Sequence, residues 1–184
     1  MTKGLPLAIT CGDPAGVGLE VFLAALEKIG NEIPVVWFGD SRHLPYGTPF
    51  TKWSPKTPNT IAPGLNLYQI DFTNPAILGQ ADPENAEGVI SSIEKATKFA
   101  KSGQVAGICT APINKKSIQS NSFKFPGHTD YLSQKLDGKS LMFMISNAIK
   151  IALVTDHIPL SQIATYLNSD IIERKLSLLE KSLK

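Results

Sequence analysis

The chain has 184 residues, of which 42% are hydrophobic and 18% are charged, so it is long enough for one domain with a sizeable core. Eighteen basic and sixteen acidic residues leave a net charge of +2, which is too balanced to indicate binding to nucleic acid or to an anionic membrane. No apolar run approaches the roughly 18 residues that a membrane-spanning helix needs, and the N-terminus lacks the architecture of a signal peptide. The two cysteines show no CxxC spacing, which fits a reducing compartment, and we expect a cytoplasmic protein.

The first part of the sequence alternates between strand and helix patterns. Residues 5–10 and 33–38 are apolar runs of strand length, typical of strands that are buried on both faces of a sheet. Between them, residues 19–29 carry apolar side chains at helical spacing, and Gly30 is a suitable helix stop. Residues 41–63 hold several prolines, which predicts irregular structure with room for a short edge strand. The next expected elements are a strand at 65–70, a helix after Asp82-Pro83 that ends near Gly103, and a strand at 105–109.

The last part of the sequence predicts a hairpin and two helices. Residues 141–145 and 149–155 are strand patterns joined by a short polar turn. One helix is expected to begin near Ser161, which is a good N-cap. The last helix begins near Asp170 and carries an apolar stripe that needs a covering surface. Together, the alternating elements predict an α/β fold with a mostly parallel sheet and flanking helices.

A glycine-rich turn, TCGDPAGVG, follows the first expected strand. Glycines let the backbone approach a ligand closely, and the N-terminus of the following helix offers free N–H groups to an anion. The spacing matches neither the dinucleotide fingerprint nor the phosphate-binding loop. A tight turn that packs the helix against the sheet explains the glycines equally well. Asp13 fits both interpretations, because its carboxylate can cap backbone N–H groups or contact a ligand.

A polar segment, TAPINKK, follows the strand expected at 105–109. Ligands of open parallel sheets bind beyond the carboxyl ends of the strands, so a substrate is expected at this segment. Lys115 can anchor a phosphate or a carboxylate as a point charge, and a solvated surface role suits it equally. For Lys116 we favour the solvated role. Cys11 and Cys109 stand at strand ends, where packing as small apolar side chains is the favoured interpretation.

The stretch FPGHTDYLS places a histidine beside a threonine. His128 and Thr129 both donate and accept hydrogen bonds, so together they can hold a phosphate or a hydroxyl group. A structural hydrogen bond made by His128 and a helix cap made by Thr129-Asp130 are the alternatives.

The segment LVTDHIPLS places His157 at the end of a strand, where a neutral imidazole can bind a divalent metal. One histidine does not make a metal site, and the sequence contains no HExxH, no GxSxG and no clustered pair of carboxylates. His43 lies in the proline-rich stretch without ligand spacing around it, and we expect it at the surface.

Four segments follow one another in a fixed order: LAITCGDPAGVGLE, GICTAPINKKSI, FPGHTDYLS and ALVTDHIPLSQI. Together they resemble the 4-hydroxythreonine-4-phosphate dehydrogenase family of vitamin B6 biosynthesis, from Leu5 to about Ile172. The resemblance implies a fold similar to isocitrate and isopropylmalate dehydrogenases, which agrees with the missing dinucleotide fingerprint. It also implies oxidation of 4-phosphooxy-L-threonine with NAD (or NADP), to an amino-keto acid that decarboxylates to 3-amino-2-oxopropyl phosphate.

The resemblance also implies roles for individual residues. His128 and Thr129 match the substrate-binding pair of the family, and His157 matches the first of three histidines that hold a divalent metal (Zn, Mg or Co). Such a cation lowers the cost of the alkoxide that develops as hydride leaves for the nicotinamide. The phosphate supplies binding energy remote from the reacting carbon. The family's active site is shared between the two subunits of a homodimer.

The chain departs from the family pattern in three ways. Leu19 stands where the family often has proline, and Asp156 replaces a threonine beside the metal histidine. Family members are also much longer, and their other metal histidines and a substrate lysine lie beyond the matched segments. We therefore expect residues 1–184 to be the N-terminal portion of a longer dehydrogenase, a single α/β lobe that is inactive alone. The alternatives are a related dehydrogenase of threonate or erythronate phosphate and a phosphate acetyltransferase-like protein, which needs neither nicotinamide nor a histidine-bound metal.

Overall fold

The computed structural model describes residues 4–30, 32–57, 61–118, 127–136 and 138–183. Contacts within the chain separate it into two compact units, Met1–His128 and Thr129–Lys184. The sequence predicts a single α/β lobe over residues 1–184, whereas the parallel sheet lies wholly in the first of these units. Each unit is described by itself.

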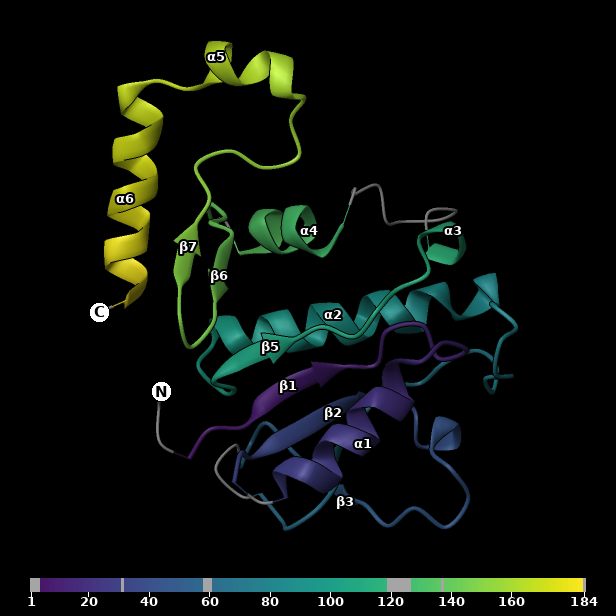
Figure 1. The fold of residues 1–184 in the computed structure, drawn as a ribbon. Helices are drawn as coiled ribbons and strands as arrows, with labels where there is room; N and C mark the ends of the chain where they lie inside the picture. Colours follow the sequence, from purple (N-terminus) through teal and green to yellow (C-terminus); the bar gives the residue numbers. More distant parts are fainter. Residues whose placement is uncertain (1–3, 31, 58–60, 119–126, 137, 184) are drawn as a thin grey trace. The chain divides into compact units, whose positions relative to one another are not determined.

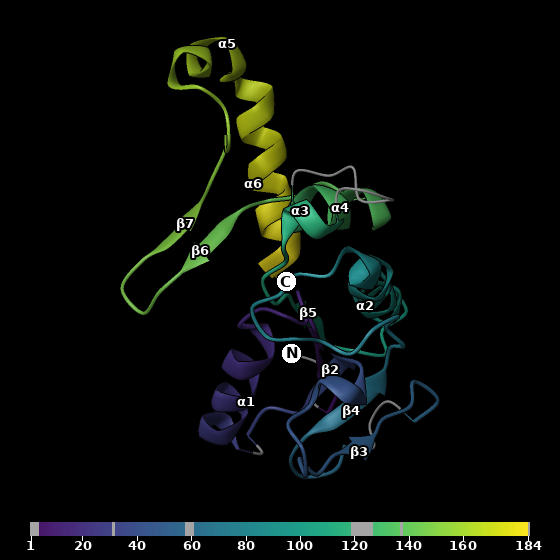
Figure 2. The same cartoon turned by 90° about the vertical axis from the view of Figure 1, so that its right-hand side faces the viewer.

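Five strands form the sheet of the first unit, in the order β3-β4-β2-β1-β5 (Figures 1 and 2). Every pair of neighbouring strands in this sheet is parallel, which confirms the prediction. The order of the strands reverses between β1 and β5, so the carboxyl ends of these two strands form a topological switch point. The strands are β1 (Leu7–Thr10), β2 (Val35–Gly39), β3 (Thr51–Lys52), β4 (Asn66–Gln69) and β5 (Gly107–Cys109).

Two long helices lie on opposite faces of this sheet (Figures 1 and 2). The first, α1, ends before Gly30, whose positive φ of 57° glycine adopts at little cost. The second, α2, buries the predicted apolar face, including Val89 and Ile93. The helical elements are α1 (Gly18–Ile29), the 3-10 turns η1 (Ser41–His43) and η2 (Pro83–Asn85), α2 (Ala86–Lys101), α3 (Lys115–Ile118) and α4 (His128–Lys135), which begins at the last residue of the unit.

The core of the first unit is built around β2, all five residues of which are buried. Phe38 lies among the rings of Trp53, Tyr68 and Phe99, with centroids 5.0 to 6.1 Å from its own. Truncating a buried ring of this size typically costs about 3–5 kcal/mol. This cluster therefore fixes β2 and β4 against α2.

The second unit contains an antiparallel hairpin followed by helices (Figure 1). The hairpin confirms the prediction for residues 141–155. The predicted N-cap at Ser161 is wrong, because Ser161 lies inside a 3-10 turn and no side chain caps the helix that follows. The elements are β6 (Phe143–Ile145), β7 (Lys150–Ala152), η3 (Leu160–Gln162), α5 (Ile163–Tyr166) and α6 (Ser169–Leu183).

Apolar side chains of the second unit are largely exposed. The predicted stripe on α6 includes Ile172, Leu176 and Leu183, which are 37%, 59% and 64% exposed. Met144 and Ile145 of the hairpin are 54% and 65% exposed. The covering surface that the stripe needs is therefore not supplied by the described residues. None of the helices that the structure describes is long and apolar enough to cross a bilayer.

Candidate functional site

Two sequence motifs meet at the carboxyl ends of β1 and β5. The amide of Asp13, in the glycine-rich turn, donates to the carbonyl oxygen of Pro112 at 2.8 Å. The amide of Ala111 donates to the hydroxyl oxygen of Thr10 at 3.2 Å. The expected ligand edge of the sheet is thus a pair of loops that hold each other in place.

Gly12 shows why the first motif requires glycine. Its φ is 66°, and a Cβ at this position would lie 2.4 Å from the carbonyl oxygen of Pro112. A Cβ on Gly18 would lie 3.0 Å from the Cβ of Ala111. The absent side chains make room for the facing loop, which favours the packing interpretation of the turn over direct contact with a ligand.

Asp13 caps the turn in which it lies. Its Oδ1 accepts a hydrogen bond from the amide of Ala15 at 3.0 Å, and its carbonyl oxygen accepts one from the amide of Gly16 at 3.0 Å. The residue also lines a small cleft of about 10 Å³ together with Asp82 and Asn114, which is room for about one water molecule. The capping role is confirmed, and contact between Asp13 and a substrate stays a prediction.

Lys115 begins α3, a short way beyond the end of β5. Asn114 holds this turn, because its carbonyl oxygen accepts from the amide of Ser117 and its Oδ1 accepts from the amide of Lys116 at 3.1 Å. Lys115 and Lys116 are exposed, while Ser117 is buried. The turn therefore keeps two ammonium groups in solvent at the edge of the sheet.

His128 is half-buried at the start of α4. Its Nε2 is screened from solvent and has no hydrogen-bond partner among the described residues. Burial lowers the pKa of His128, and the positive charge of Lys115 lowers it further, so the imidazole is neutral at pH 7. A buried nitrogen without a partner calls for a hydrogen bond from a ligand or water.

Thr129 is exposed in the first turn of α4. The helix begins at His128, so Thr129 lies within its first turn and is not the predicted N-cap. The side chain of Asp130, the other residue of that prediction, lies outside the described part of the chain. The His-Thr pair thus stands at the positive end of a helix, where the macrodipole favours negative charge.

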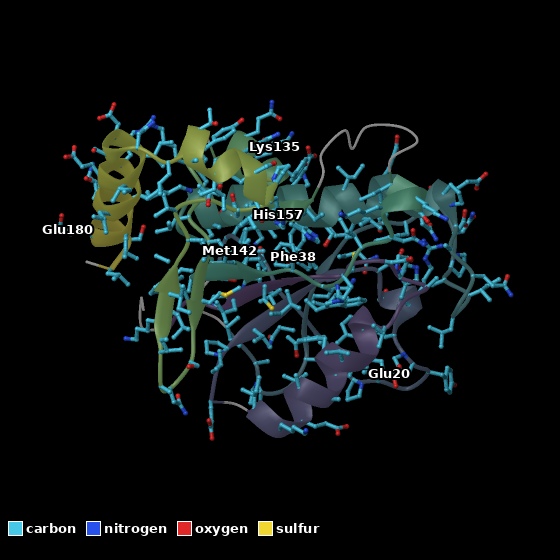
Figure 3. All side chains as sticks on the ribbon, turned by 45° about the horizontal axis from the view of Figure 1, so that its top comes forward. Glu20, Phe38, Lys135, Met142, His157 and Glu180 are labelled. Carbon is cyan, nitrogen blue, oxygen red and sulfur yellow. The ribbon has the colours of Figure 1, made fainter. Side chains whose placement is uncertain are left out.

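His157 lies in the second unit, in the segment between β7 and η3 (Figure 3). It does not end a strand of the parallel sheet, since the preceding strand is β7 of the antiparallel hairpin, which stops at Ala152. The side chain is exposed, and its φ of 54° is the only positive value among the described residues other than glycine. Such values are uncommon and concentrate at functional positions.

The described residues do not make a metal site by themselves. No three His, Cys, Asp or Glu side chains of this part of the chain lie close enough together to hold an ion. His157 is thus at most one ligand of the metal that the resemblance implies, and its sequence neighbour Asp156 is half-buried.

Asp40 is a buried carboxylate at the end of β2 that no sequence motif indicated. It accepts hydrogen bonds from the backbone and guanidinium of Arg42 at 2.7 to 3.1 Å, and from the amide of Phe72 at 3.0 Å. Burial alone would raise the pKa of Asp40, but these hydrogen bonds outweigh it and hold the pKa well below its usual range. The sequence feature that could have indicated this buried carboxylate is an acidic residue directly after a buried strand.

His43 is half-buried, so its expected place at the surface is wrong. Its ring stands edge-on against Phe72 at a centroid distance of 4.7 Å, and its Nε2 lies 3.3 Å from the carbonyl oxygen of Asn74. Burial lowers the pKa of His43. His43 is buried in part because Asp40 accepts a hydrogen bond from the amide of Phe72, which places the loop after β4 against the histidine ring.

The two cysteines differ in environment. Cys11 is buried, as predicted, and burial raises its pKa to about 12. Its amide donates to the hydroxyl of Ser92, which in turn donates to the carbonyl oxygen of Phe38 at 2.7 Å. Cys109 is exposed, so the prediction of a packed side chain is wrong there, because β5 lies at the edge of the sheet.

The first unit defines an α/β protein whose parallel sheet offers a ligand edge at a topological switch point. A family model described as "Pyridoxal phosphate biosynthetic protein PdxA" matches residues 33–184. The chain belongs to this family, which confirms the resemblance seen in the four segments and does not favour an acetyltransferase-like protein.

Curated relatives and solved structures agree with this assignment. The 4-hydroxythreonine-4-phosphate dehydrogenase of Ruegeria sp. (strain TM1040) is 37% identical over 97% of this chain and 56% of its own length. That of Paracoccus denitrificans (strain Pd 1222) is 37% identical over 100% of this chain and 58% of its own. A structure of 4-hydroxythreonine-4-phosphate dehydrogenase from Klebsiella pneumoniae superimposes with a TM-score of 0.86 at 26% identity, covering 98% of this chain and 59% of that one. A putative one from Salmonella typhimurium, at 23% identity, shows the same fold with a TM-score of 0.85 over 97% of this chain and 60% of that one.

The chain spans little more than half the length of these relatives. The predicted α/β fold with a mostly parallel sheet is confirmed. The roles of His128, Thr129, His157, Asp13 and Lys115 in binding stay predictions.

Proposed function

We propose that the protein takes part in the NAD-dependent (or NADP-dependent) oxidation of 4-phosphooxy-L-threonine in pyridoxal phosphate biosynthesis. The observation that carries this proposal is the 37% identity to a 4-hydroxythreonine-4-phosphate dehydrogenase across 97% of the chain. The aligned stretch includes both loops of the ligand edge, since it covers 97% of the chain. The product is an amino-keto acid that loses carbon dioxide to give 3-amino-2-oxopropyl phosphate.

The substrate contacts in this proposal come from His128 and Thr129, with Asp13 and Lys115 as further contacts. Three features support the contacts of His128, Thr129 and Lys115: the unpartnered Nε2 of His128, the positive end of α4, and the exposed ammonium group of Lys115. A phosphorylated substrate is an anion with several acceptor oxygens, so it matches donors and positive charge of this kind.

His157 is proposed as one ligand of a divalent cation, which can be Zn, Mg or Co. Its left-handed backbone conformation supports a functional role. When bound, the cation stabilises negative charge on the oxygen of the reacting alcohol. The described residues offer no further ligands in a cluster, so the other ligands would come from elsewhere.

We also propose that residues 1–184 act as the N-terminal portion of a longer site with an isocitrate dehydrogenase-like fold, shared between two subunits. An apolar groove of about 260 Å³ supports this, since it runs between α1 and the edge strand β5 and is lined by Ile9, Val21 and Cys109, among others. Val21 is 57% exposed. Apolar grooves beside the open edge of a sheet are typical surfaces for further polypeptide.

A chimera tests the function directly. Residues 1–184 replace the equivalent segment of the Ruegeria relative, and formation of NADH from 4-phosphooxy-L-threonine is followed with added Zn, Mg or Co. We expect turnover by the chimera, almost none by the isolated chain, and loss of turnover in the chimera carrying His157→Ala. The matched control is Leu160→Ala, because Leu160 is 85% exposed in the same segment and should be neutral.

Each outcome of this assay decides something. A chimera that oxidises erythronate 4-phosphate but not 4-phosphooxy-L-threonine would replace the proposed substrate with the sugar-acid alternative. Robust turnover by the isolated chain would refute the need for a longer site. Full activity of the His157→Ala chimera would refute the metal role.

A further inference from the structure

His43 packs against the segment of residues 70–85, which connects β4 to α2. Its ring stands edge-on to that of Phe72, and its Nε2 faces the carbonyl oxygen of Asn74 at 3.3 Å. A carbonyl oxygen can only accept, so Nε2 carries the proton of the neutral imidazole and Nδ1 carries none. Nδ1 is screened from solvent and has no hydrogen-bond partner among the described residues.

The same segment is tied to the first unit at two further points. The amide of Phe72 donates to the carboxylate of Asp40 at 3.0 Å. The amide of Gly79 donates to the carbonyl oxygen of Ala15, in the glycine-rich turn, at 2.8 Å. Neither tie changes its protonation near neutral pH, because Asp40 stays ionised and backbone groups do not titrate. Of the three ties, only that of His43 responds to pH between about 5 and 8.

The charged neighbours of His43 on its own side are Asp40 and Arg42, and their effects on the imidazole oppose each other. Asp40 favours a positive charge on the ring, and Arg42 disfavours it. Both carboxylate oxygens of Asp40 already accept from the guanidinium of Arg42. The carboxylate is therefore engaged and is not a free acceptor for a proton on Nδ1.

The charged groups of the facing segment are Asp71, Asp82 and Glu84. Asp71 and Glu84 are exposed and Asp82 is half-buried. Asp82 and Glu84 both accept from Nδ2 of Asn74, at 2.8 and 2.9 Å. These carboxylates hold the residue that His43 contacts, and none of them is a hydrogen-bond partner of Nδ1.

We propose that His43 is a pH-sensitive latch on residues 70–85, closed while the imidazole is neutral and released when Nδ1 takes up a proton. Protonation creates a buried N–H without an acceptor, which is costly until the ring or the segment moves to admit water. Release would reach the ligand edge, because Asp82 of this segment lines the small cleft with Asp13 and Asn114. This inference does not depend on the proposed oxidation.

The latch should weaken in acid. Burial lowers the pKa of His43 in the folded chain, whereas a released or unfolded histidine titrates near pH 6.5. A lowered folded pKa means that the neutral form stabilises the closed segment. This stabilisation is fully present above about pH 6.5 and is lost as the pH falls toward the folded pKa.

Amide hydrogen exchange of the 184-residue chain, followed by NMR from about pH 7.5 to about pH 5, tests the latch. The reporters are the amides of Asn74 and Gly79, which donate to Oδ1 of Asn85 and to the carbonyl oxygen of Ala15. After correction for the intrinsic exchange rate, their protection factors should fall at least about 5-fold, the low end of the cost of a buried donor without a partner. The ring signal of His43 should titrate below pH 6.5 over the same range.

The amide of Trp53 is the internal control, because it donates to the carbonyl oxygen of Leu67 within the sheet and its protection should stay constant. His43→Gln keeps a donor for the carbonyl of Asn74 but takes up no proton in this range, so both reporters should stay protected in acid. His157→Gln removes an exposed histidine of the second unit and should leave the native response unchanged. Constant protection of Asn74 and Gly79 in the native chain, or an equal fall in His43→Gln, would overturn the inference.

Discussion

Replacing Asp40 by asparagine removes the charge that holds the loop after β4 to the end of β2. The carboxylate accepts hydrogen bonds from Arg42 and from the amide of Phe72, and Phe72 is buried. The amide of Arg42 donates to Oδ1 and the amide of Phe72 donates to Oδ2. In asparagine one of these two positions is an NH2 group, which donates and cannot accept, so one of the two backbone amides loses its partner. Hydrogen bonds to a charged group contribute about 1.5–3 kcal/mol, and a buried donor left unpaired costs about 1–3 kcal/mol. We therefore expect Asp40→Asn to lower the free energy of unfolding by about 2–4 kcal/mol at pH 7.

The effect of Asp40→Asn should depend on pH in a defined direction. The pKa of Asp40 is lowered in the folded state, while an unfolded aspartate titrates near pH 3.9. The stabilisation by Asp40 is therefore fully present above about pH 5 and is lost as the pH falls below about 4 toward the folded pKa. The difference between native chain and variant should be constant from pH 5 to 7, and it should shrink in more acidic solution.

Urea unfolding followed by tryptophan fluorescence measures this difference. The chain has two tryptophans, and both Trp37 and Trp53 are buried in the first unit, so their emission reports on the unit that contains Asp40. The matched control is Asp71→Asn, an exposed aspartate in the same loop, which should cost less than about 0.5 kcal/mol. Equal unfolding midpoints for the native chain and Asp40→Asn at pH 7, or a gap that persists unchanged at pH 3, would refute the reasoning.

Two further predictions concern the ligand edge. Gly12→Ala should lower the free energy of unfolding by more than about 2 kcal/mol. The new methyl group would clash with the carbonyl oxygen of Pro112, and this clash is added to the cost of an alanine in the left-handed conformation. The matched control is Gly47→Ala, because Gly47 is also at positive φ but has open space around it. This variant should show only the conformational cost of about 1 kcal/mol. Similar losses of stability in the two variants would contradict the close approach of Gly12 to Pro112. The native chain should react rapidly with Ellman's reagent at one thiol, because Cys109 is exposed while Cys11 is buried with its pKa raised to about 12. Cys109→Ser should abolish that fast phase, and a fast phase of two thiols would contradict the burial of Cys11.

Local patterns in the sequence were sufficient to predict most of the elements. An apolar run such as that of β2 indicates a strand that is buried on both faces. The spacing of apolar residues in α2 indicates which face of the helix packs against the sheet. Errors occurred where tertiary contacts override a local signal. Ser161 has the chemistry of an N-cap, yet Pro159 starts a 3-10 turn before it. His43 has no local feature that indicates burial, because Phe72 reaches it from a distant loop.

The site was predictable to the extent that strand ends are predictable. Lys115 was correctly placed beyond β5, since the parallel order puts the carboxyl ends of strands at one edge. Ser92 was not predictable, because it bridges Cys11 and Phe38 from the middle of α2. These hydrogen bonds depend on how α2 packs against the sheet. No local pattern in the sequence indicates which residues of α2 will meet Cys11 and Phe38.

The glycine-rich turn after β1 positions the loop after β5, and through this loop it positions Lys115. Thr10 and Asp13 hold Ala111 and Pro112 by hydrogen bonds. Two residues after Pro112, Asn114 caps the turn that carries Lys115. The position of the ammonium group is therefore set by residues that need not touch a ligand. Gly12→Ala should consequently weaken phosphate binding by displacing Lys115, even though it removes no group that binds phosphate. Retention of native phosphate affinity in a folded Gly12→Ala chain would show that the two loops position the lysine independently.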